Sequence, residues 1–148
     1  MMIALPAELD PRRIRVGCDV VAISDVEASV SEFGDRYLRK VFTTGEIEDC
    51  RGADRIARLA ARFAAKEAVI KAFLDPRMAF PLREIEVTKR HLLPTLRLSG
   101  SVARRARQQG WTSTSLSLSH ADCHAMALLV VACDPPTVSA ALTGGGRR

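Results

Sequence analysis

The sequence predicts a single α+β domain in which a long helix packs on a mostly antiparallel sheet. Short apolar or alternating segments indicate strands, and the helical segments among them follow no regular strand–helix repeat. A length of 148 residues suffices for one hydrophobic core and is too short for two ordinary domains. We place the domain at residues 14–133 and expect residues 1–13 and 134–148 to be flexible tails.

The first half of the domain is predicted to open with a strand. Residues 14–23 are β-branched and mostly apolar, which is typical of a buried strand. A helix should follow, with Ser24 as its N-cap and Gly34 as its end. Residues 43–51 predict a second, short helix.

The longest helix is expected between Asp54, its N-cap, and Leu74, because the Asp-Pro sequence after Leu74 cannot continue a helix. The second half then predicts a helix that Gly110 closes, and a final hairpin whose last strand is fully buried. In chain order, these elements are strands over 82–87 and 95–99, a helix over 101–110, and strands over 114–120 and 125–132.

The charge pattern argues against nucleic acid as a partner. The net charge is +5, but aromatic residues are only 5% of the chain and no stacking platform lies among the scattered arginines. An enzyme that acts on anionic partners explains this balance equally well.

The apolar pattern argues against a membrane span. The longest apolar run, residues 125–133, is far shorter than the roughly 18 residues that a spanning helix needs. The N-terminus lacks the basic-then-apolar order of a secretory signal, so we expect a cytoplasmic protein. The four cysteines form no C-x-x-C pair, and we expect them to be reduced and mostly buried.

Glu67 interrupts the apolar face of the long helix. The face is defined by Ile56, Leu59, Phe63, Ile70 and Leu74, and at about 100° per residue Glu67 falls only some 20° from Ile56 and Leu74. Lys71 follows one turn later at the border of this face, and Arg62 falls on the opposite, solvated side. A carboxylate held against a core costs several kcal/mol unless a cation or hydrogen-bond donors compensate it.

Two interpretations of Glu67 and Lys71 remain open at this point. They could form an ordinary i,i+4 pair, worth about 0.3–0.5 kcal/mol on an exposed helix. Alternatively, Glu67 binds a metal and Lys71 a phosphate, which requires a second carboxylate because Mg²⁺ is usually held by one or two carboxylates plus substrate phosphates.

Asp19 is the candidate for that second carboxylate. It interrupts the first apolar strand, where aspartate is disfavoured, although it could instead cap a backbone turn at a strand end. His120 ends another strand beside Ser117 and Ser119, where hydroxyls and an imidazole could meet an anion. A histidine at a strand end is more often structural.

These residues lie within motifs that resemble a known family. "VGCD", "RFAAKEAVIKA", "REIEV", "PTLRLSG" and "SLSLSH" occur in the order seen in holo-acyl-carrier-protein synthase, the short single-domain class of 4′-phosphopantetheinyl transferase. The resemblance covers about Ile14 to Ala132, and its most specific part is the helix motif that contains Glu67 and Lys71.

The resemblance implies a reaction and roles for the site residues. Phosphopantetheine would pass from coenzyme A to a serine of an acyl carrier protein and release adenosine 3′,5′-bisphosphate. Asp19 and Glu67 would bind Mg²⁺, and Lys71 would neutralise phosphate oxygens. Glu67, or a metal-bound water beside it, would take the serine proton, while Arg62 and His120 would contact the nucleotide phosphates.

The resemblance also implies partners. Arg36, Arg39 and Lys40 would form the surface for the acidic carrier protein, and the active protein would be a homotrimer with active sites between subunits. Relatives commonly continue the helix motif as K-A-x-G, whereas this chain has Leu74 in place of the glycine. A non-catalytic module that binds coenzyme A or a nucleotide on the same fold is therefore the alternative.

Overall fold

The computed structural model describes residues 11–90 and 93–134. It confirms an α+β architecture of two antiparallel sheets and four α-helices within the described ranges. The elements, in chain order, are the 3₁₀ turn η1 (Pro11–Arg13), β1 (Ile14–Ala22), α1 (Ile23–Val41), α2 (Thr44–Asp49), α3 (Arg55–Ala72), the 3₁₀ turn η2 (Leu82–Glu84), β2 (Ile85–Arg90), β3 (Leu93–Leu98), α4 (Gly100–Gln108), β4 (Trp111–His120) and β5 (His124–Cys133).

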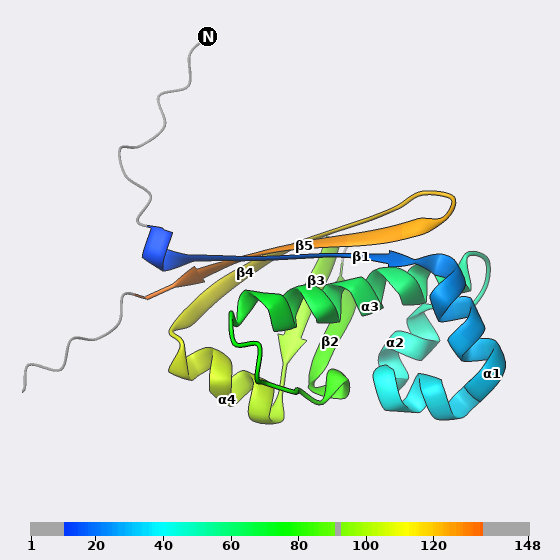
Figure 1. Ribbon diagram of the computed structural model, residues 1–148, viewed down its shortest axis with the longest axis horizontal. Helices are drawn as coiled ribbons and strands as arrows, with labels where there is room; N and C mark the ends of the chain where they lie inside the picture. The colour runs from blue at the N-terminus through cyan, green and yellow to red at the C-terminus, as the bar shows by residue number, and fades with distance from the viewer. Residues whose placement is uncertain (1–10, 91–92, 135–148) are drawn as a thin grey trace, which may run out of the picture.

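The larger sheet has the strand order β1-β5-β4, and α3 lies along one of its faces (Figure 1). The hairpin β2-β3 forms the second sheet, while α1 and α2 lie at one end of α3 and α4 at the other. This arrangement places the part of β1 that contains Gly17 and Asp19 against the last turns of α3. None of the described helices is long and apolar enough to cross a membrane. The cytoplasmic location stays a prediction.

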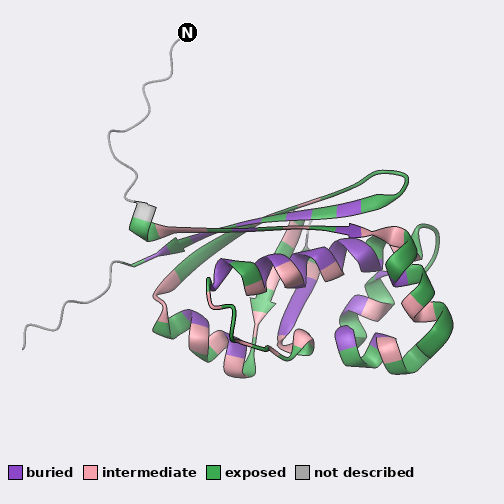
Figure 2. Ribbon diagram, viewed as in Figure 1, coloured by how far each residue is buried: buried purple, intermediate pink, exposed green. Residues whose placement is uncertain are grey.

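The contact between β1 and α3 is unusually close because it involves a glycine and a row of alanines. A Cβ atom on Gly17 would lie 1.8 Å from the carbonyl oxygen of Ala68. The side of α3 that faces the sheet is buried along its length (Figure 2) and includes Ala60, Ala64 and Ala68. The predicted apolar stripe through Ile56, Phe63 and Ile70 is therefore only the half-buried edge of the core. Small side chains set the actual buried face.

Strand β5 differs from its prediction because only one of its faces is buried. Its residues alternate between buried and exposed along the whole strand. The outer face of β1 and β5 carries five exposed apolar side chains, which we call the outer apolar face: Val16, Val20, Met126, Leu128 and Val130. This pattern was hidden in the sequence because both faces of β5 are apolar.

Several predicted helix ends are corrected by the backbone. Helix α1 begins at Ile23 without a side-chain cap, so Ser24 is not its N-cap. Gly34 does not end the helix as predicted: with φ 51° it introduces a kink, and the helix continues to Val41. Asp54 is the N-cap of α3 in position only, since its side chain makes no capping hydrogen bond. η1 places an ordered turn before β1, and the domain boundaries themselves stay a prediction.

A buried ion pair, which the sequence did not reveal, fixes α3 to its neighbours. Lys66 is fully buried, and its Nζ donates to Glu46 Oε2 at 2.8 Å, to the Leu82 carbonyl at 2.9 Å and to the Ile85 carbonyl. Glu46 also accepts from the Val87 amide at 2.9 Å. Burial lowers the pKa of Lys66, and the carboxylate of Glu46 opposes this effect. The pair joins α2, α3 and the start of β2.

Candidate active site

The two predicted metal-binding carboxylates line the same pocket. Asp19 reaches it from β1 and Glu67 from α3, and the open space is about 500 Å³. Asp19 sits on the inner face of β1 because its register partner in β5 is the buried Ala127. The structure therefore brings together the two residues that the sequence singled out as misplaced carboxylates. The remaining lining residues include Asp25, Ser29, Tyr37 and Phe63.

Lys71 belongs to the same cluster. Its Nζ donates to Asp19 Oδ1 at 2.7 Å, which links the last turn of α3 to β1. The lysine side chain is 54% exposed, whereas that of Asp19 is 15% exposed. The hydrogen bond to Asp19 raises the pKa of Lys71, so the lysine carries its charge at neutral pH.

Glu67 is half-buried and is the least compensated charge of the cluster. Burial raises its pKa, the nearby Asp19 carboxylate raises it further, and Lys71 offsets part of the effect. Within residues 11–90 and 93–134, no donor forms a hydrogen bond to its carboxylate. The environment disfavours the ionised form, which a cation placed between the two carboxylates would stabilise.

The donor set of this pocket fits Mg²⁺. Two carboxylates are the usual protein contribution where substrate phosphates and water complete the coordination. No group of three or more histidine, cysteine, aspartate or glutamate side chains is arranged to hold a metal in the described part of the chain. The pocket lining offers carboxylate oxygens and contains no histidine or cysteine, so its donors suit a hard cation better than zinc.

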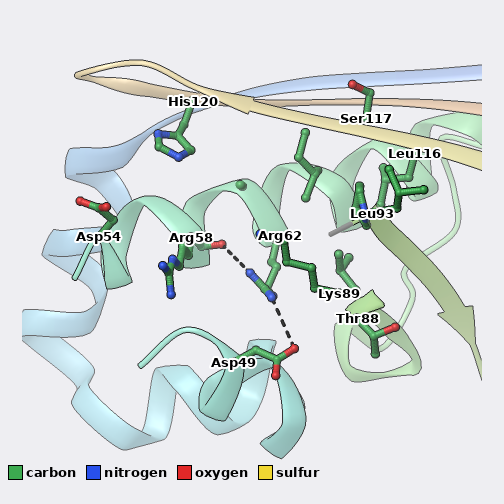
Figure 3. A pocket seen from close by; sticks show the side chains of 14 residues that line it. Asp49, Asp54, Arg58, Arg62, Thr88, Lys89, Leu93, Leu116, Ser117 and His120 are labelled. Atoms are coloured by element: carbon green, nitrogen blue, oxygen red, sulfur yellow. Dashed lines mark hydrogen bonds and ion pairs between the residues drawn. The ribbon is translucent and has the colours of Figure 1, made fainter. Parts of the chain in front are cut away.

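Arg62 and His120 line a second pocket of about 550 Å³ (Figure 3). His120 projects from the end of β4 toward α3, and Lys89 reaches the pocket from β2. Arg58, one turn before Arg62, adds a further cation on α3. The three cations outnumber the two carboxylates of the lining, Asp49 and Asp54, which suits an anionic ligand.

The helical wheel placed Arg62 on the solvated side of α3, and this prediction is wrong. Its side chain is 8% exposed and lies 3.6 Å from the carboxylate of Asp49. One guanidinium nitrogen donates to the Arg58 carbonyl at 3.4 Å, and the buried Nε has no hydrogen-bond partner among the described residues (Figure 3). The unpartnered donor is consistent with a guanidinium that binds an additional acceptor.

The two pockets lie on different sides of α3. They share no lining residue, and five residues of helix rotate Glu67 by about 140° from Arg62. One protomer therefore brings Asp19, Glu67 and Lys71 together but does not place Arg62 and His120 beside them.

The predicted carrier-protein surface lies on the second half of α1. Arg36, Arg39 and Lys40 are exposed there, beyond the interruption at Gly34. Arg39 forms an exposed ion pair with Asp35 at 3.3 Å. An exposed pair of this kind is weak, so Arg39 stays available to bind a partner's carboxylate.

Sequence analysis missed several residues that line the pockets. Tyr37 and Ser29 reach the carboxylate pocket because the turn at Gly34 folds the two halves of α1 toward each other. Burial raises the pKa of Tyr37, and a hydrogen bond with Ser29 opposes the shift. No local pattern marks these positions. Arg58 could have been found, because it repeats the position of Arg62 one turn earlier.

Comparison with known proteins gives a consistent assignment. The sequence profile of the 4′-phosphopantetheinyl transferase superfamily matches residues 15–128. A holo-[acyl-carrier-protein] synthase of Leptospira biflexa is 38% identical over 125 residues, which cover 82% of this chain and 98% of that protein. Another of Herpetosiphon aurantiacus is 39% identical over 122 residues, with 77% and 94% covered.

Solved structures agree with this assignment. The coenzyme A complex of the synthase from Chronobacterium ammoniagenes has a TM-score of 0.73 and 29% identity, and covers 82% of this chain and 98% of its own. The Helicobacter pylori holo-[acyl-carrier-protein] synthase in complex with coenzyme A has a TM-score of 0.70 and 28% identity, with 79% and 99% covered. The family resemblance is thus confirmed, and this chain belongs to the 4′-phosphopantetheinyl transferase superfamily, alongside its holo-[acyl-carrier-protein] synthases.

Proposed function

We propose that the protein transfers the 4′-phosphopantetheine group of coenzyme A to a serine of an acyl carrier protein, with Mg²⁺ as cofactor. The observation that carries this proposal is the shared pocket of Asp19 and Glu67, together with the hydrogen bond from Lys71 to Asp19. Relatives that match most of the chain bear the name of this activity, and two of their structures contain coenzyme A.

The carrier serine hydroxyl attacks the phosphorus nearest to pantetheine. A new oxygen–phosphorus bond forms, the bond from that phosphorus to the bridging pyrophosphate oxygen breaks, and adenosine 3′,5′-bisphosphate leaves with the electron pair. Mg²⁺, when bound, supplies positive charge to the pyrophosphate. Asp19 and Glu67 would hold it, and the three donors of the Lys71 ammonium would bind phosphate oxygens. The serine proton passes to Glu67 or to water beside it.

Arg62 and His120 are proposed to bind the nucleotide phosphates. The unpartnered Nε of Arg62 and the surrounding cations support this role. Because this pocket lies on another side of α3, we propose that a second copy of the chain supplies it, within a homotrimer that has active sites between subunits. The outer apolar face supports such an assembly, since a soluble protomer rarely leaves a contiguous apolar strand face exposed.

The exposed cysteines provide a test of the assembly. Cys18 lies on the outer face of β1 between Val16 and Val20, whereas Cys123 is exposed in the β4–β5 turn. A maleimide reagent should modify Cys123 quickly and Cys18 slowly in the native protein. Sedimentation should show a trimer. Equal modification rates, together with an active monomer, would contradict the proposed assembly.

The transfer itself is tested by mass spectrometry. The protein is incubated with coenzyme A, Mg²⁺ and apo carrier proteins, and each carrier should gain the mass of one phosphopantetheine. Asp19→Ala and Glu67→Ala should each abolish the gain while the protein remains folded, as judged by circular dichroism. A variant that transfers near the parent rate would exclude the two-carboxylate site.

The non-catalytic alternative depended on the absent glycine at Leu74. Leu74 has φ 56° and so keeps the left-handed backbone that a glycine would adopt, but its exposed side chain occupies space that a glycine would leave open to coenzyme A. Nucleotide binding without any mass gain on a panel of carriers would favour the alternative.

A further inference from the structure

Lys71 holds the position of a counter-ion at the carboxylate pair. Its ammonium donates to Asp19 Oδ1 at 2.7 Å, and Glu67, one turn earlier on α3, lines the same pocket as Asp19. Two carboxylates thus share one ammonium. The carboxylate pair remains undercompensated by one positive charge, which a divalent cation in place of the ammonium would supply.

The two ends of this ion pair differ in their freedom to move. Asp19 is held in β1, and its side chain is 15% exposed, whereas the Lys71 side chain is 54% exposed at the end of α3. A lysine ammonium is a point charge on a flexible stem with three donors. Lys71 can therefore exchange a carboxylate for a phosphate by side-chain rotation alone, with no movement of the helix.

We propose that Lys71 is a place-holder for the divalent cation. Its ammonium neutralises Asp19 until the cation binds, and it is then released to the phosphate oxygens of coenzyme A. The inference rests on the proposed function for the identity of the phosphate ligand. It goes beyond that function because it makes the availability of Lys71 depend on the metal.

The physical reason is the difference in charge between the competitors. A divalent cation attracts the two carboxylates with twice the charge of an ammonium, and it repels that ammonium when both lie within a few ångströms. Asp19 then binds the divalent cation, and its hydrogen bond with Lys71 breaks. Because the released ammonium stabilises bound phosphate, metal and coenzyme A should each raise the affinity for the other.

The first measurement is the affinity for Mn²⁺, by calorimetry on the full-length protein without coenzyme A. Lys71→Met removes the competitor, so it should bind Mn²⁺ about three- to tenfold more tightly than the parent. Arg55→Met, which removes an exposed cation from the start of α3, should leave the affinity unchanged. With coenzyme A present, the parent should gain Mn²⁺ affinity and Lys71→Met should gain much less.

The second measurement needs no variant at the site and separates displacement from a general charge effect. The chain contains four lysines, namely Lys40, Lys66, Lys71 and Lys89, so selectively ¹³C-labelled lysine gives a simple spectrum. Addition of Mg²⁺ should make the Lys71 side chain more mobile in relaxation measurements, and coenzyme A should make it rigid again. The buried Lys66 is the internal control and should not change.

The outcomes distinguish this inference from the proposed function. Tighter Mn²⁺ binding by Lys71→Met together with a mobile Lys71 supports the place-holder. Unchanged or weaker Mn²⁺ binding by this variant, or a Lys71 side chain that stays rigid with Mg²⁺, overturns it even if the parent transfers phosphopantetheine. If the parent protein releases Lys71 on metal binding but modifies no carrier protein, the proposed function is overturned, and the place-holder role of Lys71 is still supported.

Discussion

The close approach of β1 to α3 predicts a large effect from a single added methyl group. In Gly17→Ala, the new Cβ would lie 1.8 Å from the carbonyl oxygen of Ala68, 2.8 Å from its carbonyl carbon and 3.1 Å from the amide nitrogen of Ala72. Ordinary contacts begin at 3.4 Å, so strand and helix must separate by about 1.6 Å. All three atoms belong to the backbone, and no rotamer change can relieve the clash.

The free energy of unfolding should fall by about 3 kcal/mol or more. Overpacking costs about 1–3 kcal/mol where side chains can adjust, and backbone atoms cannot. For a domain of this size, such a loss lowers the melting temperature by roughly 6–12 °C. Activity should fall as well, because Asp19 lies two residues beyond Gly17 and its bond to Lys71 spans the same junction. A displacement of about 1 Å in a catalytic group can cost about a hundredfold in rate.

Urea unfolding can be followed through the single tryptophan, Trp111, whose ring stacks on Phe73 at a centroid distance of 4.3 Å. Gly45→Ala in α2 is the matched control, since its Cβ would meet only side-chain oxygens, that of Glu86 at 3.3 Å and that of Thr43 at 3.9 Å, and no backbone atom. We expect the control to change the free energy of unfolding by less than about 1 kcal/mol. If Gly17→Ala were equally mild and fully active, the close approach would be wrong.

Three further predictions concern charged groups. Burial and a neighbouring carboxylate raise the pKa of Glu67, so the stability of the metal-free protein falls as pH rises through that pKa. Glu67→Gln should therefore be more stable than the parent at neutral pH. The difference should vanish below about pH 4.3, the ordinary pKa of glutamate. Urea titrations at pH 4 and pH 7.5 test this, and an equal difference at both would contradict it. Lys66→Met leaves Glu46 buried without its cation and should lower the free energy of unfolding by about 3–5 kcal/mol in the same assay. A loss below about 1 kcal/mol would contradict this prediction. Lys40→Glu reverses a charge on the exposed surface of α1, so it should raise the Michaelis constant for the carrier protein severalfold and leave that for coenzyme A unchanged. Steady-state kinetics at two salt concentrations check this, and an unchanged Michaelis constant for the carrier protein would remove this carrier surface.

The carboxylates of the site could be predicted because they violate the pattern around them. Asp19 interrupts an apolar strand and Glu67 an apolar helix face, and neither position is stabilised by local structure. Their common pocket follows from the packing of α3 on β1. Misplaced charges are informative because burial without compensation is costly.

The burial of Arg62 and Lys66 could not be predicted for a related reason. The helical wheel was centred on large apolar residues, whereas the face of α3 that meets the sheet is formed mainly by alanines. Alanine contributes little to a hydrophobic pattern, yet it permits the close contact that Gly17 requires. The partner of Lys66, Glu46, lies 20 residues earlier, so only the tertiary fold brings this pair together.

If the proposed function is correct, the position of the two pockets predicts that activity depends on assembly. Glu67 and Arg62 point about 140° apart on α3, and a helix with its side chains is about 10 Å across, so one coenzyme A molecule cannot span both pockets of one protomer without passing around the helix. In the proposed homotrimer, a second copy would supply the pocket of Arg62 and His120, and the outer apolar face would be covered by subunit contacts. Specific activity should therefore fall on dilution in parallel with the trimer fraction measured by sedimentation. Val20→Glu, which places a charge on the outer apolar face, should shift both curves to higher protein concentration while the protomer stays folded. Activity that is independent of concentration, in a range where the trimer dissociates, would show that each protomer carries a complete site.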